Sequence, residues 1–117
     1  MLSEDKLYDI EKGFWTRGAD YYRAHTDGQC LTVFPEMLGL LDREKIAQSA
    51  AEGRWKDVAI THKTVLKAAD DFVILSYEAG AKRADGKAYR ALASTGYVRR
   101  GDEWKMAFHQ QTPLEAK

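Results

Sequence analysis

The half of the chain that follows Gly53 alternates between apolar and polar residues with a period of two, which is the period of a β-strand. Turn signals at 70–71, 85–86 and 101–102 divide this half into long stretches, and the last stretch runs from 103 to 113. The Asp-Gly pair at 85–86 favours the tight turn of a hairpin. The pattern therefore predicts a meander of four long antiparallel strands. In the first of these strands, one face is expected to carry Val58, Ile60, His62, Thr64 and Leu66.

The first half of the chain begins with helical periodicity. Ser3 is a candidate N-cap, and apolar side chains recur at helical spacing as far as Trp15. Gly18 predicts the end of this helix, because glycine favours a helix C-cap. Asp20 is then the N-cap of a short second helix that carries Tyr22.

A short strand and a third helix complete the first half. The run TDG at 26–28 predicts a turn, and CLTVF at 30–34 predicts a strand that Pro35 ends. Asp42 is the expected cap of a helix over 43–51. Helices that precede a meander predict an α+β fold, with the helices packed on one face of a strongly curved antiparallel sheet.

The composition indicates one domain, residues 1–117, with one core. Lys and Arg together number 18, as do Asp and Glu, so no net charge favours nucleic acid or an anionic membrane as a partner. No apolar run is long enough for a membrane-spanning helix. The single cysteine, Cys30, predicts a reducing, cytoplasmic setting. The sequence contains no CxxC, HExxH or glycine-rich phosphate loop, so neither a metal nor a cofactor is predicted.

The order and punctuation of these elements resemble the nuclear transport factor 2-like superfamily. The resemblance is carried by Gly18–Ala19–Asp20, Phe34–Pro35, the cap at Asp42 and the turn Gly101–Asp102–Glu103–Trp104, and it is closest to the SnoaL-like and domain-of-unknown-function 4440 groups. It implies a cone, in which a bent sheet, with a mixed edge, wraps round the first helix and leaves a pocket at the open end. It also implies a homodimer through the sheet face. Such families include isomerases, dehydratases and cyclases as well as non-catalytic binding and association domains, so the fold does not decide the function.

Two enzymes of the superfamily can be compared with this chain residue by residue. Ketosteroid isomerase-like members have an aspartate base before the proline of the first strand, where this chain has Phe34. They have an oxyanion-binding tyrosine seven residues before the glycine of the first helix, where this chain has Glu11. Limonene epoxide hydrolase-like members need an aspartate near the end of the last strand, where this chain has Thr112. Steroid isomerase chemistry is therefore not expected.

The face of the sheet that lines the pocket depends on the register of the strands. In similar families, alternate polar side chains of the last strand point into the cone, which would place Met106, Phe108, Gln110 and Thr112 inside and His109 outside. Two-residue loops at 85–86 and 101–102, with a three-residue loop at 69–71, extend this face to the row His62–Glu78–Ala93–Gln110. Apolar residues then fill the deep end and polar ones collect near the mouth, as a small-molecule pocket requires.

The opposite face is the alternative. A two-residue loop at 70–71 would place Thr64, Tyr77, Ser94 and His109 in one row on that face. This face is also moderately apolar and would suit a dimer interface. A single β-bulge exchanges the two faces, so the sequence leaves both arrangements open.

Three acidic or basic residues are candidates for proton transfer. Glu11 lies on the apolar face of the first helix, where it is either solvated near the mouth and paired with an arginine, or a pocket carboxylate that acts as a base or a donor. His62 opposite Glu78 is either a structural histidine or an oriented general base. The residues predicted to contact a ligand are Trp15, Tyr22, Phe34, Tyr97, Phe108 and Gln110.

The sequence supports three hypotheses of function. The first is a dimeric domain that binds a small, mainly apolar organic molecule in its central pocket. The second is a metal-independent proton-transfer enzyme, an isomerase, dehydratase or cyclase, in which His62 and Glu78 form the base and Glu11 the acid. The third is a non-catalytic self-association module that uses the face of its sheet.

Overall fold

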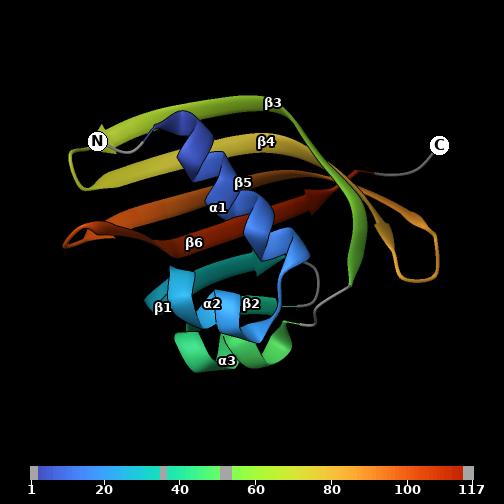
Figure 1. Ribbon diagram of the computed structural model, residues 1–117, viewed down its shortest axis with the longest axis horizontal. Coiled ribbons are helices and arrows are strands. Elements are labelled where there is room, and N and C mark those ends of the chain that lie inside the picture. The colour runs from blue at the N-terminus through green and yellow to red at the C-terminus, as the bar shows by residue number, and fades with distance from the viewer. Residues whose placement is uncertain (1–2, 35–36, 51–53, 115–117) are drawn as a thin grey trace.

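The computed structural model describes residues 3–34, 37–50 and 54–114, and in it the helices and the strands follow one another largely as predicted (Figure 1). The four strands of the second half are present within one residue of their expected limits. One strand of the first half, β2, was not predicted. The elements are α1 (Glu4–Thr16), α2 (Ala19–His25), β1 (Thr26–Phe34), β2 (Met37–Asp42), α3 (Arg43–Ser49), β3 (Trp55–Ala69), β4 (Phe72–Arg83), β5 (Ala88–Arg100) and β6 (Glu103–Pro113).

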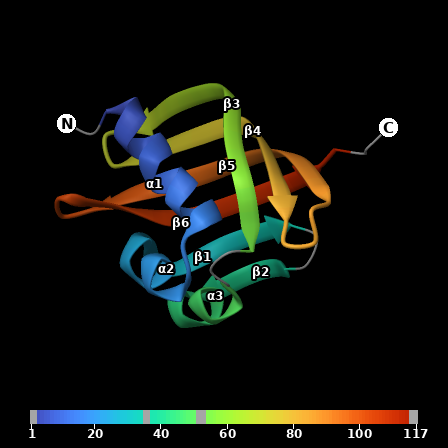
Figure 2. The same ribbon diagram turned by 45° about the vertical axis from the view of Figure 1, so that its right-hand side comes forward.

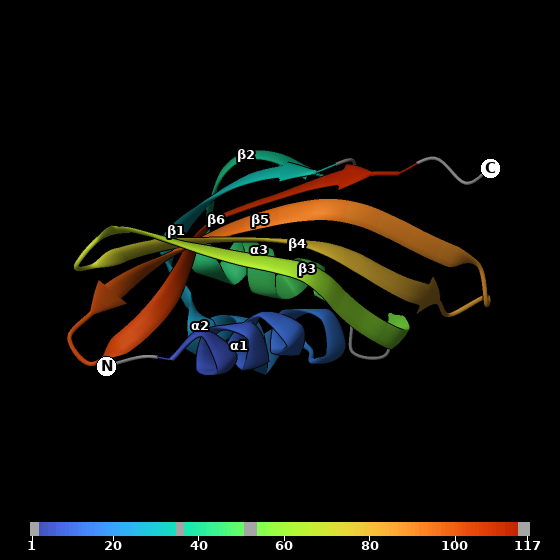
Figure 3. The ribbon, with the colours of Figure 1, turned by 90° about the horizontal axis from the view of Figure 1, so that it is seen from above.

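The strands form one mixed sheet in the order β2-β1-β6-β5-β4-β3. The neighbours β1 and β6 are parallel, and the other neighbours are antiparallel. The sheet curves and stays open, and the three helices lie on its concave side (Figure 3). This arrangement confirms the predicted α+β fold, in which helices pack on one face of a curved mixed-edge sheet.

The helix ends follow local chemistry, with one change from the prediction. The Ser3 side chain accepts a hydrogen bond from the Lys6 amide at 3.2 Å, and Asp42 accepts one from the Lys45 amide at 2.8 Å. The first helix ends at Thr16, and Gly18 is the N-cap of α2 rather than the C-cap of α1. The N-cap role predicted for Asp20 is therefore wrong, because α2 already includes this residue.

The turn predicted at 26–28 is also wrong, because β1 begins at Thr26 directly after α2. The reason is a long-range pairing that local turn chemistry does not reveal. Thr26 pairs with Met106 of β6, and the Asp27 carboxylate is held by the Arg100 guanidinium at 2.9 Å. Partners far along the chain thus extend the strand through a sequence with turn-forming residues.

The register of the central hairpin is shifted by one residue from the predicted one. The strands around Asp85–Gly86 separate after the pair Lys82–Ala88, so the loop is longer than two residues. Glu78 consequently pairs with Leu92 and not with Ala93. Since side chains alternate between the two faces, a shift by one residue moves every side chain of one strand, relative to its partner, to the opposite face.

A β-bulge in β6 exchanges the faces of the last strand. The pairs Arg100–Glu103 and Tyr97–Met106 agree with the prediction, but the next pair is Gly96–Phe108, which leaves one extra residue in β6. Beyond the bulge, His109 lies on the concave side with Met106. The prediction that Phe108, Gln110 and Thr112 line the interior is therefore wrong, and the alternative face that carries Tyr77 and His109 is the inner one.

Three irregularities also interrupt β3, where the pairing with β4 shifts between Lys56 and Ala59, between Thr61 and Thr64 and between Lys67 and Ala69. His62 lies in the second one and has a positive φ of 54°. The first part of β3 bends toward α3 (Figure 2). The residues predicted to share one face of this strand are therefore not all on the same side. Val58 and Ile60 pack against the core, while Leu66 is exposed.

The core lies between α1 and the concave face of β4, β5 and β6. Its buried apolar residues include both helix and strand side chains, and Ile46 of α3 closes one end. Cys30 is among them, and burial raises the pKa of its thiol to about 12, so it behaves as a small apolar core residue. Among the described residues, no helix combines the length and the hydropathy that a membrane span requires.

Candidate functional site

Two hollows of the described part of the structure lie at opposite ends of α1. One is a cavity of about 350 Å³ between the end of α1, the helices α2 and α3 and the sheet. Its lining combines aromatic rings with a few polar groups, as ligand cavities do. The described residues that line it are Phe14, Trp15, Tyr22, Thr32, Ile46, Ser49, Arg54, Trp55, Arg83, Met106, His109 and Gln111.

The second hollow, of about 730 Å³, is a groove between the start of α1 and the hairpins β3–β4 and β5–β6. Charges of both signs line it, among them Lys6, Arg99, Asp70 and Asp102. Charged groups on exposed hairpin ends are commonly solvated, and none of the buried polar residues that the structure describes lines this groove. The smaller cavity is therefore the candidate site.

Glu11 is the centre of a buried polar network beneath the candidate site. Its side chain is fully buried, although α1 is otherwise apolar on this face. The Tyr97 hydroxyl donates to Oε1 at 2.6 Å, the Thr95 hydroxyl donates to Oε2 at 2.7 Å, and the Tyr77 hydroxyl also donates to Oε2. Trp15 in turn donates its indole N–H to the Tyr77 oxygen at 3.0 Å. These donors supply the hydrogen bonds that a buried carboxylate needs.

The surroundings of Glu11 keep its phenolic partners protonated. Burial raises the pKa of both Tyr77 and Tyr97 well above the usual value, and the negative charge of Glu11 raises it further. Both hydroxyl groups therefore remain donors at any physiological pH. Glu11 is thus buried and not solvated at the mouth, and it lies below the cavity and not in its wall.

A chain of side chains connects Glu11 to the cavity. The Thr95 oxygen lies 2.7 Å from Nδ1 of His109, and Nε2 of His109 lies 3.0 Å from the amide nitrogen of Gln111. The oxygen of that amide accepts a hydrogen bond from the Tyr89 hydroxyl at 2.8 Å. His109 and Gln111 line the cavity, so the chain runs from a buried carboxyl group to the wall of the candidate site.

The direction of these hydrogen bonds determines the tautomer of His109. The single hydroxyl hydrogen of Thr95 points to Glu11, so the Thr95 oxygen must accept a hydrogen from Nδ1 of His109. Nε2 then carries a lone pair, which accepts a hydrogen bond from the Gln111 amide nitrogen at 3.0 Å. Burial lowers the pKa of His109 from 6.5, and this outweighs the nearby charge of Glu11, which acts in the opposite direction. The ring is therefore neutral at pH 7, and Gln111 binds its acceptor nitrogen.

Aromatic rings form the wall opposite this chain. The ring centroids of Trp15 and Trp55 are 5.4 Å apart, and those of Trp55 and Tyr89 are 4.7 Å apart. Tyr22 closes the side toward α2, where its hydroxyl donates to the Phe14 carbonyl at 2.6 Å. Trp15 and Tyr22, two of the predicted ligand contacts, therefore line the cavity.

The predicted pair of His62 and Glu78 lies outside the cavity. Nδ1 of His62 is 3.8 Å from Oε1 of Glu78, and the His62 side chain is 79% exposed. Arg90 binds the same carboxylate at 2.7 Å, and its hydrogen bond holds the pKa of Glu78 below the usual value. The two residues are close, but Glu78 pairs with Thr61 and not with His62, which lies in an irregularity of β3, and both side chains are on the outer side of the sheet.

The other predicted contact residues also differ in position. Phe108 and Gln110 are on the outer side, where Gln110 accepts a hydrogen bond from the Ser94 hydroxyl at 2.6 Å. Tyr97 is fully buried and binds Glu11 instead of lining the cavity. Phe34 is the last residue of β1, and its side chain lies outside the described part of the structure.

Sequence reasoning assigned no binding role to Arg54, Arg83 and Gln111, and it put Tyr77 and His109 only on the alternative face. One signal was available for the inner row. Tyr77 and Thr95 are polar residues with apolar neighbours two positions away, which is the pattern of a polar network on a buried face. The positions of Arg54 and Arg83 depend on how β3 bends, and no local pattern indicates this.

Comparison with known proteins supports the fold. No protein-family model matches the chain, and no curated protein sequence matches it significantly. Among solved structures, an NTF2-like protein from Cytophaga hutchinsonii is 14% identical, with a TM-score of 0.77 over 97% of this chain and 100% of the other. An NTF2-like protein of unknown function from Prochlorococcus marinus is 16% identical, with a TM-score of 0.73 over 100% and 97%. The association domain of C. elegans CaMKII is 12% identical, with a TM-score of 0.66 over 91% and 88%. Similarity at these identities bears on the fold and not on the activity.

Proposed function

Since this chain has the nuclear transport factor 2-like fold, we propose that it binds a small, mainly apolar organic molecule in the cavity between α1, α2, α3 and the sheet. The observation that carries the proposal is a cavity of about 350 Å³ walled by Trp15, Trp55 and Tyr22. This volume is within the range of small-molecule sites, near its lower end. A one- or two-ring compound would fit, with His109 and Gln111 as its polar contacts.

The Glu11 network supports a rigid site. A cavity keeps its shape only if the groups around it are held by packing or by hydrogen bonds. Here Trp15 is held through Tyr77, and His109 is held through Thr95, so both walls are connected to the same buried carboxyl group. A preorganised wall lowers the entropic cost of binding a small ligand.

Binding can be tested by filling the cavity. Ser49 of α3 lines it, so a Ser49→Trp variant would occupy the space with an indole. The matched control is Gln48→Trp, which adds the same side chain at the neighbouring exposed position. We expect neutral one- and two-ring compounds, including indole and 2-naphthamide, to shift the amide NMR signals of the cavity residues in the parent and the control but not in Ser49→Trp. If none of these compounds at millimolar concentration shifts the signals in the parent protein, the proposal is wrong.

Proton transfer is a second candidate function, and the chain from Glu11 to His109 is the observation that favours it. Once the bound compound displaces the Gln111 amide from Nε2 of His109, this nitrogen would accept a proton from a carbon next to a carbonyl group of the compound and return it to another position. Glu11 would act through Thr95 as a positioning residue. Deuterium incorporation into a bound ketone such as 2-tetralone, lost in His109→Gln, would support this function, and equal incorporation in both proteins would exclude it. The predicted pair of His62 and Glu78 is a less suitable base, because solvent reaches it.

Self-association through the sheet is a third candidate function, as a homodimer, and the outer face of the sheet favours it. Leu31 and Leu40 are cross-strand partners on that face, as are Val33 and Leu38, and all are exposed in the single chain. An apolar patch of this kind is typical of an interface. We expect Leu40→Lys to reduce the mass measured by light scattering to that of the monomer. Leu66→Lys, at the opposite edge of the sheet, is the control and should leave the mass unchanged. A parent protein that is monomeric at high concentration would contradict this candidate.

Two finer assignments belong to the proposal. The SnoaL-like or domain-of-unknown-function 4440 type would agree with a cavity that holds a small organic molecule. A cytoplasmic location would agree with the buried, unpaired thiol of Cys30.

A further inference from the structure

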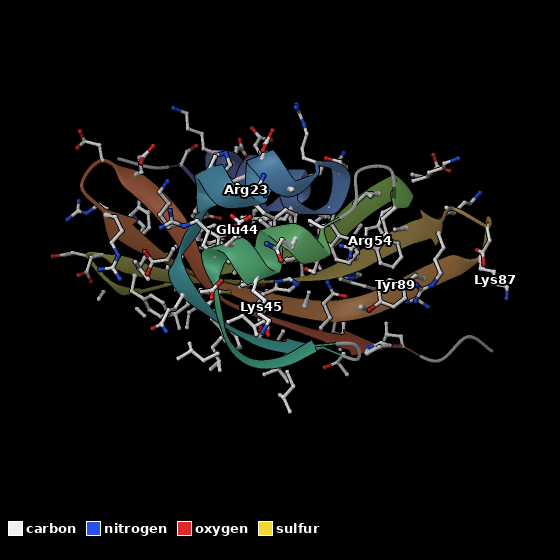
Figure 4. The ribbon with its side chains drawn as sticks, turned by 90° about the horizontal axis from the view of Figure 1, so that it is seen from below. Arg23, Glu44, Lys45, Arg54, Lys87 and Tyr89 are labelled. Atoms are coloured by element: carbon white, nitrogen blue, oxygen red, sulfur yellow. The ribbon has the colours of Figure 1, made fainter. Side chains whose placement is uncertain are left out.

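Two arginines stand at the aromatic end of the candidate cavity. Arg54 immediately precedes β3, and Arg83 ends β4 as the cross-strand partner of Trp55. The guanidinium carbons of Arg54 and Arg83 lie 5.8 and 5.0 Å from the centroid of the Trp55 ring, and that of Arg83 lies 5.0 Å from the Tyr89 centroid. Both side chains therefore rest on aromatic rings that belong to the site or border it. Figure 4 shows Arg54 and Tyr89 on the side where α3 ends.

These two arginines differ from Arg23, Arg90 and Arg100 in their ionic partners. Arg23, Arg90 and Arg100 each bind a carboxylate at 2.7 to 2.9 Å. Within the described part of the chain, neither Arg54 nor Arg83 has a carboxylate within ion-pair distance. The neighbouring Lys82 is already paired with Asp57 at 3.8 Å. The guanidinium groups at the cavity thus keep their capacity to bind an anion.

The remaining described residues of the cavity wall do not neutralise this charge. Burial raises the pKa of Tyr22 to about 12 in spite of the opposing charge of Arg54, so its phenol is neutral. Burial lowers the pKa of His109, so its imidazole is neutral as well. Glu11 lies behind the wall, where Tyr77, Tyr97 and Thr95 satisfy it. Among the described lining residues, the charged groups at pH 7 are the two arginines.

We propose that the ligand of this cavity is an organic anion whose apolar ring enters the aromatic end while its carboxylate is bound by Arg54 and Arg83. The inference rests on the proposed binding function and specifies the class of its ligand. A guanidinium group is planar, keeps its charge and presents parallel N–H donors that match a carboxylate. Stacking on Trp55 and Tyr89 leaves the edge of the guanidinium free for those hydrogen bonds.

The test compares two probes that differ only in charge. 2-Naphthoate and its neutral isostere 2-naphthamide have the same ring system, and titration calorimetry measures their Kd at constant ionic strength. We expect the parent protein to bind the acid at least about tenfold more tightly than the amide, because hydrogen bonds between charged groups are stronger than neutral ones. Arg83→Gln and Arg54→Gln should each reduce this preference several-fold and leave the Kd of the amide nearly unchanged.

Arg90→Gln is the matched control, because it removes the same charge from β5 on the outer side of the sheet. It should keep the preference for the acid. Equal binding of acid and amide in the parent, or a preference that both cavity variants retain, would overturn the inference while the proposed binding function stands. If neither probe nor any neutral compound binds the parent, the binding function itself fails. A phosphate ester, 2-naphthyl phosphate, is the third probe, and tighter binding of this compound than of the acid would overturn the assignment to carboxylates.

Discussion

The molecule contains two pairs of glutamate and histidine at nearly the same separation, one on each face of the sheet. Glu11 and His109 are 3.7 Å apart on the inner face, and Glu78 and His62 are 3.8 Å apart on the outer face. The side chains of the inner pair are 0% and 11% exposed, whereas those of the outer pair are 23% and 79% exposed. Separation therefore does not distinguish the pairs, and burial does.

Burial changes which partners each carboxylate has. The Glu78 carboxylate binds Arg90 and is accessible to water. Losing one partner therefore lowers the free energy of unfolding only slightly, because solvent replaces that partner. Glu11 has only protein donors, and each of them is itself buried and needs an acceptor. An identical pair of residue types is thus part of a connected network in one place and a solvated contact in the other.

The largest expected difference between the pairs is in the free energy of unfolding. Glu11→Leu leaves the Tyr77, Tyr97 and Thr95 hydroxyls without their acceptor inside the core, which should cost about 3 to 5 kcal/mol. Glu78→Leu removes a solvated carboxylate and should have a much smaller effect. Urea denaturation at pH 7 measures both variants. Equal losses would show that burial does not distinguish the two glutamates.

A smaller difference is expected for the neighbouring hydroxyls Thr95 and Ser94, which lie on opposite faces of β5. Thr95→Val keeps the shape but removes both the donor to Glu11 and the acceptor for His109, at a cost of about 1 to 3 kcal/mol. Ser94→Ala removes a contact with Gln110 that water can replace. Nitrogen-15 NMR of His109 adds a readout that stability alone does not give. The signal of the Nδ1–H tautomer should be lost or exchange-broadened in Thr95→Val and stay unchanged in Ser94→Ala.

The contrast between the two pairs also explains which features of the fold and of the candidate site could be predicted from the sequence. The long alternating stretches and their turns predicted the α+β fold and the four strands of the second half, because periodicity is a local property. Glu11 could be recognised as a candidate, since a carboxylate on an apolar helix face needs a partner. The face of the sheet that lines the cavity could not be predicted, because it depends on single residues. The loop after Lys82 is longer than two residues, and β6 contains one extra residue near Ala107. β2 was missed because its short apolar run, Met37–Asp42, has no turn signal that separates it from the helix of Arg43.

The pH dependence of stability should distinguish the histidines next. The native pKa of His109 is lowered from 6.5, so between these values the unfolded chain binds a proton that the native protein does not. The stabilising contribution of the neutral ring is complete above pH 6.5 and is lost as the pH falls toward the native pKa, at up to about 1.4 kcal/mol per pH unit. His109→Gln should reduce this slope in a series of urea denaturations between pH 7.5 and 5 and leave the part that comes from His25, whose pKa burial also lowers. His62→Gln should keep the whole slope, and an equal reduction in both variants or a reduction in neither would contradict the assignment to His109.

The smallest expected effect is on ligand binding at the outer pair. His62→Ala should leave the Kd of 2-naphthoate within about twofold of the parent value, because the exposed imidazole has no contact with the cavity and, at its distance, its charge is screened by solvent. His109→Gln provides the comparison, because His109 lines the cavity and His62 does not. We expect His109→Gln to weaken the binding of 2-naphthoate more than His62→Ala does. A tenfold loss of binding in His62→Ala, with no loss in His109→Gln, would move the site to the outer face of the sheet.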